Sequence, residues 1–165
     1  MFFDRNFFMQ TNAPDYNDPF NRRNARNHKN TDPYLYNCAG YALNCFSWYC
    51  PVEQFDYYTV WGSEDETERE RLTDEFVQQI LKDFPSVRVI DSISDLHDNE
   101  YAMAFRVGED DFHFIKRGDN GVWYEKCGAT AYIERKTKED VFSDAWGPFD
   151  EYNGPLVLMA NKKVA

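Results

Sequence analysis

The sequence predicts an α+β fold, with helices first along the chain and an antiparallel sheet of about five strands after them. Two observations support this prediction. Apolar residues recur at helical spacing before Pro85, whereas short runs rich in β-branched and aromatic residues follow it. The 165 residues are enough for one domain with a core, and 42% of them are hydrophobic.

The N-terminal residues, 1–33, have a different composition from the rest of the chain. From Thr11 to Pro33 they are mostly Asn, Asp, Arg and Pro, with few apolar groups to offset the entropy lost on ordering. We therefore expect an irregular N-terminal arm, residues 1–33, followed by a single domain, residues 34–165. The sequence shows no internal repeat and no sign of a second domain.

Two helices are expected in the first half of the domain. Asn37 is a good N-cap for an apolar helix that starts at Cys38 and stops at Pro51. Ser63 and Glu66 form a capping box for a second helix that ends before Pro85. Its apolar residues at helical spacing are Leu72, Phe76, Val77, Ile80, Leu81 and Phe84.

The strands are expected in the second half, where short runs of residues are rich in β-branched and aromatic side chains. Residues 118–121, Gly-Asp-Asn-Gly, indicate a hairpin turn because Asn and Gly accept positive φ. Helices followed by hairpin-linked strands favour an antiparallel meander over a doubly wound sheet. The expected strands are 87–90, 101–107, 112–116, 122–126 and 156–159.

Charge and cysteine usage exclude several functions. A net charge of −11, from 29 acidic and 18 basic residues, argues against a nucleic-acid partner and against an anionic membrane surface. The sequence from Met1 to Arg5 is not a basic start followed by an apolar run, so we expect no signal peptide and a cytoplasmic protein. Four cysteines without a CxxC pair favour free thiols over disulfides or structural zinc, so no metal and no cofactor is expected.

Cys38 is the candidate nucleophile. A thiolate at a helix N-terminus is stabilised by the partial positive charge there, and the backbone N–H of the same residue can donate to an oxyanion. The side-chain amide of Asn37 could supply a second donor. The alternative is that Cys38 is simply a small buried residue of an apolar helix.

His113 and Glu125 are the candidate partners of Cys38. His113 lies on a strand between Phe112 and Phe114, which face the opposite way, and an imidazole on a rigid strand can act as general base for a facing thiol. Glu125 lies on the other arm of the hairpin and could accept the Nδ1 proton of the imidazole. A three-residue loop would place Glu125 on the His113 face, whereas a two-residue turn would place Lys126 there.

Two segments of the chain resemble a known family. Residues 37–43 (NCAGYAL) look like the nucleophile helix of papain-like amidases and peptidases of the NlpC and CHAP type. Residues 111–128 resemble the histidine segment of small bacterial and phage members. The resemblance implies a papain-like fold with a nucleophile helix packed on the sheet, catalytic Cys38 and His113, and a third residue at Glu125, where the family pattern has His.

The resulting hypothesis is a monomeric cysteine hydrolase that cleaves an amide or peptide bond through a Cys38 acyl-enzyme. Asn37 and Tyr36 would contact the oxyanion or the substrate. The substrate would be a peptide, a protein or a peptidoglycan-like chain, in the cytoplasm of a bacterial cell or of a phage-infected host. The alternatives are an acyltransferase with the same Cys–His dyad and an impaired papain-like module that binds a partner. The aromatic residues that could serve such a module are Tyr34, Tyr36, Trp48 and Trp61.

Overall fold

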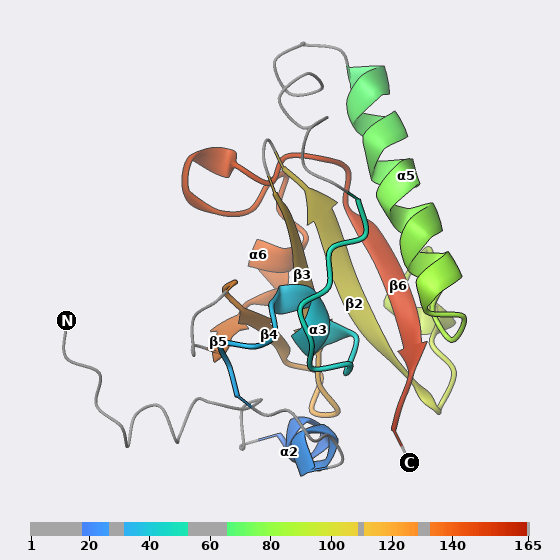
Figure 1. Ribbon diagram of the computed structural model, residues 1–165, viewed down its shortest axis with the longest axis vertical. Helices are drawn as coiled ribbons and strands as arrows, with labels where there is room; N and C mark the ends of the chain where they lie inside the picture. Colours follow the sequence, from blue (N-terminus) through green and yellow to red (C-terminus); the bar gives the residue numbers. More distant parts are fainter. Residues whose placement is uncertain (1–17, 27–31, 53–65, 109–110, 129–132, 165) are drawn as a thin grey trace, which may run out of the picture.

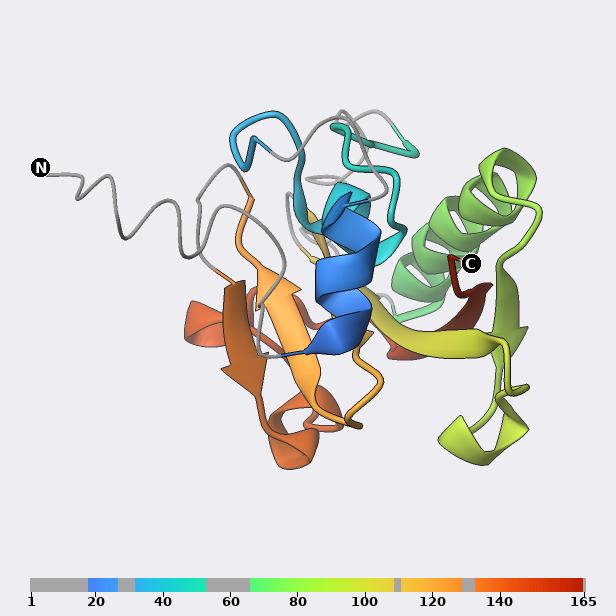
Figure 2. The ribbon, with the colours of Figure 1, turned by 90° about the horizontal axis from the view of Figure 1, so that it is seen from below.

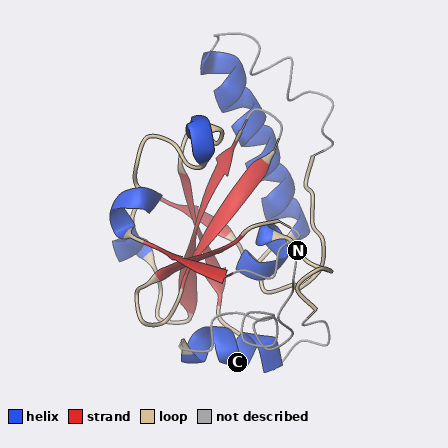
Figure 3. Cartoon of the chain, turned by 90° about the vertical axis from the view of Figure 1, so that its left-hand side faces the viewer, coloured by secondary structure: helices blue, strands red, loops and turns tan. Residues whose placement is uncertain are grey.

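The computed structural model describes residues 18–26, 32–52, 66–108, 111–128 and 133–164. Within these ranges the chain forms an open, fully antiparallel sheet with helices on both sides (Figures 1 and 3). The expected α+β class is therefore confirmed. The described ranges contain no helix that is both long enough and apolar enough to cross a membrane.

The sheet has six strands in the order β1-β6-β2-β3-β4-β5. Strands β2 to β5 form the expected meander, but the last strand of the chain enters between β1 and β2 and pairs with both. The strands are β1 (Arg88–Ile90), β2 (Glu100–Val107), β3 (Phe112–Arg117), β4 (Trp123–Lys126), β5 (Ile133–Lys136) and β6 (Val157–Lys162).

The expected count of about five strands was wrong because β5 was missed. Its sequence, Ile-Glu-Arg-Lys, has a single apolar residue and no alternation of apolar with polar side chains. It is an edge strand that is ordered by pairing with β4 along its whole length. Backbone pairing at a sheet edge needs no apolar pattern, so the sequence carried little signal.

Helices occupy both faces of the sheet. Helices α3 (Cys38–Ala42) and α5 (Glu66–Asp83) pack on one face, over a core that includes Phe76, Phe105 and Phe114. The short helix α6 (Lys138–Val141) belongs to a second cluster with Trp123 and Trp146 on the opposite face. Two single 3₁₀ turns, Ile93–Asp95 and Pro148–Asp150, lie in the connecting segments.

The helix that starts at Cys38 is much shorter than expected. Asn37 is its N-cap, as predicted, and its Oδ1 accepts the Gly40 N–H at 3.0 Å. The chain then leaves the helix after Ala42, and Phe46 adopts a positive φ of 47°. A Cβ on Gly40 would stand 2.1 Å from the backbone oxygen of Ser47. The close approach of the Ser47 backbone to α3 therefore requires glycine at position 40.

The second expected helix is observed as α5, which ends before Pro85, as predicted. The Phe84 N–H still donates to the Ile80 carbonyl at 2.8 Å. Ser63, the expected N-terminal partner of the capping box, lies outside the described residues. Glu66 and Glu68 occupy the first turn of the helix, where the helix dipole favours negative charge.

The N-terminal arm contains a helix that the sequence did not predict. Residues Pro19–Arg26 form α2, so the expectation of an irregular arm was wrong for this segment (Figure 2). Asp18 Oδ1 accepts the Phe20 N–H at 2.9 Å, and the fully buried Phe20 ring packs 4.9 Å from the Tyr101 ring. Only one large apolar side chain docks α2, which left no periodic pattern in the sequence.

Candidate functional site

A cavity of about 830 Å³ opens where the start of α3 meets β3 and β4. Cys38, His113 and Glu125 all line it, so the structure brings the three predicted catalytic residues to one site. Its size lies within the range of small-molecule and substrate pockets. The wall opposite α3 comes from β5, α6 and the loop between α6 and β6.

The hairpin between β3 and β4 decides which residue shares a face with His113. The strands pair through Lys116–Tyr124 and Arg117–Trp123, and the Gly118 N–H donates to the Val122 carbonyl at 2.9 Å. The loop therefore has three residues, Asp119 to Gly121, and Gly121 adopts a positive φ of 78°. Of the two registers left open by the sequence, the structure has the one that places Glu125 on the His113 side.

Lys126 consequently points to the opposite face, toward α3. Its side chain is fully buried, and Nζ donates to the Tyr36 carbonyl at 2.7 Å and to the Gly128 carbonyl at 2.5 Å. Burial lowers the pKa of Lys126 to about 8, although the neighbouring Cys38 opposes this shift. Through its hydrogen bond with Tyr36, Lys126 thus holds the segment before Cys38 against the end of β4.

Cys38 occupies the first position of α3 and is 5% exposed. Its Sγ lies 4.0 Å from the Phe112 carbonyl oxygen, and the thiol is close enough to His113 to raise the pKa of the imidazole. The contact with Phe112 is possible because α3 packs against β3 (Figure 1). The thiol therefore reaches the imidazole from the α3 side of the sheet.

His113 lies between the thiol and a carboxylate. Its Nε2 is 2.7 Å from Glu125 Oε2, which leaves Nδ1 as the ring nitrogen for Cys38. The sequence prediction placed Glu125 at Nδ1, whereas in the structure Glu125 contacts Nε2. Burial opposes a charged imidazole, but the thiolate of Cys38 and the carboxylate of Glu125 outweigh it and raise the pKa of His113.

Glu125 is held ionised by two cationic neighbours. Its other oxygen, Oε1, lies 3.1 Å from the Lys136 ammonium on β5. Burial raises the pKa of Glu125, but His113 and Lys136 together bring it below its ordinary value. Lys136 was not predicted as a site residue, since it lies on the strand that the sequence did not reveal.

Two aromatic side chains enclose the imidazole. The His113 ring lies edge-on to Trp146, with centroids 6.1 Å apart, and is tilted against Tyr152 at 5.4 Å. Trp146 and Tyr152 are joined by a pair of backbone hydrogen bonds, both 3.0 Å long. The buried Arg106 guanidinium stacks on Trp146 at 5.1 Å and donates to the Ser143 carbonyl, so it supports this wall from behind.

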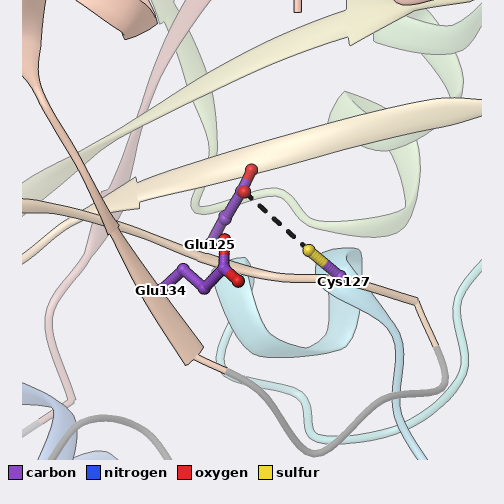
Figure 4. A group of neighbouring side chains, drawn as sticks. All are labelled: Glu125, Cys127 and Glu134. Atoms are coloured by element: carbon purple, nitrogen blue, oxygen red, sulfur yellow. Dashed lines mark hydrogen bonds between the residues drawn. The ribbon is translucent and has the colours of Figure 1, made fainter. Parts of the chain in front are cut away.

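One group of side chains at the site could hold a metal ion. Ligand atoms of Glu125, Cys127 and Glu134 lie within 4.8 Å of one another (Figure 4). Burial and the Glu125 and Glu134 charges raise the pKa of Cys127 to about 12, so this thiol is protonated at neutral pH. Both oxygens of Glu125 already contact cationic groups, and the arrangement is better explained as support for the imidazole.

The remaining predicted residues have different surroundings. Asn37 lines the cavity, and one of its side-chain N–H groups donates to the Tyr49 carbonyl at 2.7 Å. Tyr36 is fully buried against Phe46 and does not line the cavity, so it has no surface for a substrate. Trp48 is 56% exposed and lines the cavity, whereas Trp61 lies outside the described residues.

Comparison with known proteins identifies no relative. No family model, no curated protein and no solved structure matches the chain.

Proposed function

We propose that the protein is a cysteine hydrolase of the papain-like kind, which cleaves an amide or peptide bond through an acyl-enzyme on Cys38. The observation that supports this most strongly is that Cys38, His113 and Glu125 line one cavity, with Glu125 hydrogen-bonded to His113 and with Cys38 close enough to raise the pKa of the imidazole. A thiol, an imidazole and an orienting carboxylate in this order are the groups that thiol-dependent acyl transfer requires.

In the first half of the reaction, Cys38 Sγ attacks the carbonyl carbon of the scissile amide. The new S–C bond places a negative charge on the carbonyl oxygen. His113 then gives its Nδ1 proton to the amide nitrogen, and the C–N bond breaks to release an amine. A thioester on Cys38 remains, and the charge of Glu125 steadies the imidazolium before this transfer.

In the second half, water attacks the thioester while His113 accepts a proton from it. The C–S bond breaks, a carboxylic acid leaves, and the Cys38 thiolate is restored beside protonated His113. Because Nε2 remains hydrogen-bonded to Glu125, the same ring nitrogen faces the thiol in both halves. The contact with Glu125 therefore fixes the ring orientation as well as its charge.

The start of α3 offers donors for the carbonyl oxygen. Cys38 is the first helical residue, so its backbone N–H has no partner within the helix. Asn37 has a second side-chain N–H besides the one that binds Tyr49. These two groups are the proposed oxyanion donors, and Tyr36 is not included because it is buried away from the cavity.

Two alternatives use the same groups differently. An acyltransferase would pass the acyl group from Cys38 to an amine in place of water. A papain-like module that only binds a partner is favoured by the low exposure of the thiol and by the exposed Trp48 in the same cavity. Peptides, proteins and peptidoglycan-like chains are the candidate ligands in each case.

Site-resolved labelling followed by a digestion assay tests the proposal. Iodoacetamide should label Cys38 fastest, and His113→Ala should slow this labelling strongly while circular dichroism shows a retained fold. Wild-type protein, but not Cys38→Ala, should then cleave members of a peptide mixture analysed by mass spectrometry. Cleavage that persists in Cys38→Ala would reject the mechanism, and amine adducts among the products would favour the acyltransferase.

A further inference from the structure

We propose that the substrate carries a positively charged group, a lysine or arginine side chain or a free amine, close to the amide bond that Cys38 attacks. This inference rests on the proposed function and names the substrate class for the same cavity. It follows from the charge and the aromatic lining of the cavity walls, which the reaction itself does not require.

The cavity walls are strongly acidic. Four exposed carboxylates line the cavity in addition to Glu125. They come from separate parts of the fold: the start of β3, strand β5, helix α6 and the loop before β6. The four residues are Asp111, Glu134, Asp140 and Glu151.

Basic groups are fewer than carboxylates among the described lining residues. Lys136 is the one lysine among them, and there is no arginine. Its ammonium lies 3.1 Å from Glu125 Oε1 and is also attracted by Glu134 and Asp140. Together with His113 there are two cationic groups against five carboxylates, so the described lining carries a net negative charge.

Aromatic rings lie in the same walls as the carboxylates. Trp48, Trp146 and Tyr152 line the cavity, and indole and phenol rings attract cations through their faces. The Tyr152 hydroxyl donates to Asp111 Oδ2 at 3.3 Å, which keeps one ring and one carboxylate together beside His113. An aromatic face next to a carboxylate suits an ammonium or a guanidinium, whereas an acidic substrate would be repelled.

Three matched peptide probes test the charge of the preferred substrate. Each is a dipeptide vinyl sulfone with lysine, norleucine or glutamate next to the reactive group. The Cys38 thiolate adds to the vinyl carbon β to the sulfone, the carbon α to the sulfone takes a proton, and no group leaves. Norleucine matches the lysine chain without its charge, so the ratio of the two labelling rates isolates the effect of the ammonium. EDTA in the buffer removes any contribution from metal ions.

The lysine probe should label Cys38 at least about tenfold faster than the norleucine probe at low ionic strength, and the glutamate probe should be slowest. The difference should shrink in about 1 M salt, where the Debye length falls to about 3 Å. Equal rates for lysine and norleucine, or labelling by none of the probes at a Cys38 that iodoacetamide labels rapidly, would overturn the inference.

Neighbouring residues provide matched variants with the same change in net charge. Glu151→Gln and Asp140→Asn should each reduce the lysine preference severalfold, because these carboxylates line the cavity. Asp150→Asn and Glu139→Gln should leave it unchanged, since neither lines the cavity. Equal effects of all four would assign the preference to overall charge and overturn the inference. Slow iodoacetamide labelling of Cys38 would instead reject the proposed function.

Discussion

Glu125 Oε2 lies 2.7 Å from His113 Nε2, and the two residues are each 7% exposed. They come from adjacent strands and are twelve residues apart in the sequence. Because this contact is shielded from water, the attraction between the two charges is stronger than in a surface ion pair, and the contact also sets which ring nitrogen faces Cys38. The three-residue loop of the hairpin makes it possible.

Cys38 should be the fastest-alkylated cysteine of the folded protein. Burial raises the pKa of both Cys127 and Cys50, and acidic neighbours raise it further, so these thiols stay protonated in the same cavity. Cys38 lies beside His113, whose pKa is raised by Cys38 and Glu125 despite burial. Iodoacetamide labelling followed by peptide mass mapping measures each rate. Faster labelling of Cys50 or Cys127 would contradict an activated Cys38.

Glu125→Gln should keep the fold and weaken the imidazolium. The Glu125 charge contributes to the raised pKa of His113, so its removal lowers that pKa, and the thiolate–imidazolium pair is lost at a lower pH. The upper edge of the pH plateau of Cys38 alkylation should therefore move down. Turnover should fall on the order of ten- to a thousand-fold. His113→Ala should cost more, because it removes the base itself.

Glu139→Gln is the control for this variant. Glu139 is exposed on α6, and its substitution by Gln changes the net charge by the same amount as Glu125→Gln without removing a contact of His113. Its alkylation profile should match that of the wild type. An unchanged profile in Glu125→Gln would leave Cys38 and His113 in place and remove Glu125 from the proposed mechanism.

Lys116 should make stability rise with pH in the alkaline range. Burial lowers the pKa of Lys116 to about 7, although the Asp18 charge opposes the shift. From about pH 7 to 10 the unfolded chain binds more protons at this residue than the folded protein does, so the free energy of unfolding increases with pH. The contribution is at most about 1.4 kcal/mol per pH unit.

Lys116→Met should therefore flatten the pH dependence of urea unfolding between about pH 7 and 9. The variant also deprives the Tyr41 carbonyl and Asn44 Oδ1 of a donor, so the slope with pH, and not the absolute stability, is the informative quantity. Lys162→Met, at the exposed end of β6, should keep the wild-type slope. Equal slopes in all three proteins would mean that Lys116 is not the titrating group.

The helix of the N-terminal arm should contribute to stability through Phe20. This ring is fully buried against Tyr101 and against the Lys116 ammonium, whose Nζ is 5.0 Å from its centroid. Phe20→Ala should lower the free energy of unfolding by about 3–5 kcal/mol. Phe149 is fully exposed, and Phe149→Ala should change it by less than about 0.5 kcal/mol. Similar effects of the two substitutions would show that α2 is not docked on the sheet.

Local features were predictable from the sequence because they depend on neighbouring residues. The Asn37 cap, helix α5 with its stop at Pro85, and the turn at Gly121 each follow from side-chain chemistry within a few positions. The same reasoning selected Cys38 and His113, whose helix start and strand alternation were both visible in the chain.

The features that escaped prediction depend on contacts between distant segments. Helix α2 is held by a single buried ring and strand β5 by backbone pairing at an edge, and neither leaves a periodic pattern. The insertion of β6 between β1 and β2 has the same origin, since strand order is set by packing of the whole sheet.

By itself, the sequence determined the α+β class, the cap before Cys38 and the alternation that sets His113 apart from its aromatic neighbours, because propensity and periodicity act over short distances. The tertiary structure decided that α3 stops after five residues, that Glu125 and not Lys126 reaches the imidazole, and that Nε2 is the nitrogen it meets. It also gathered the four cavity carboxylates from separate elements. Those outcomes depend on loop length, strand register and the approach of segments far apart in the chain, which only the folded protein brings together.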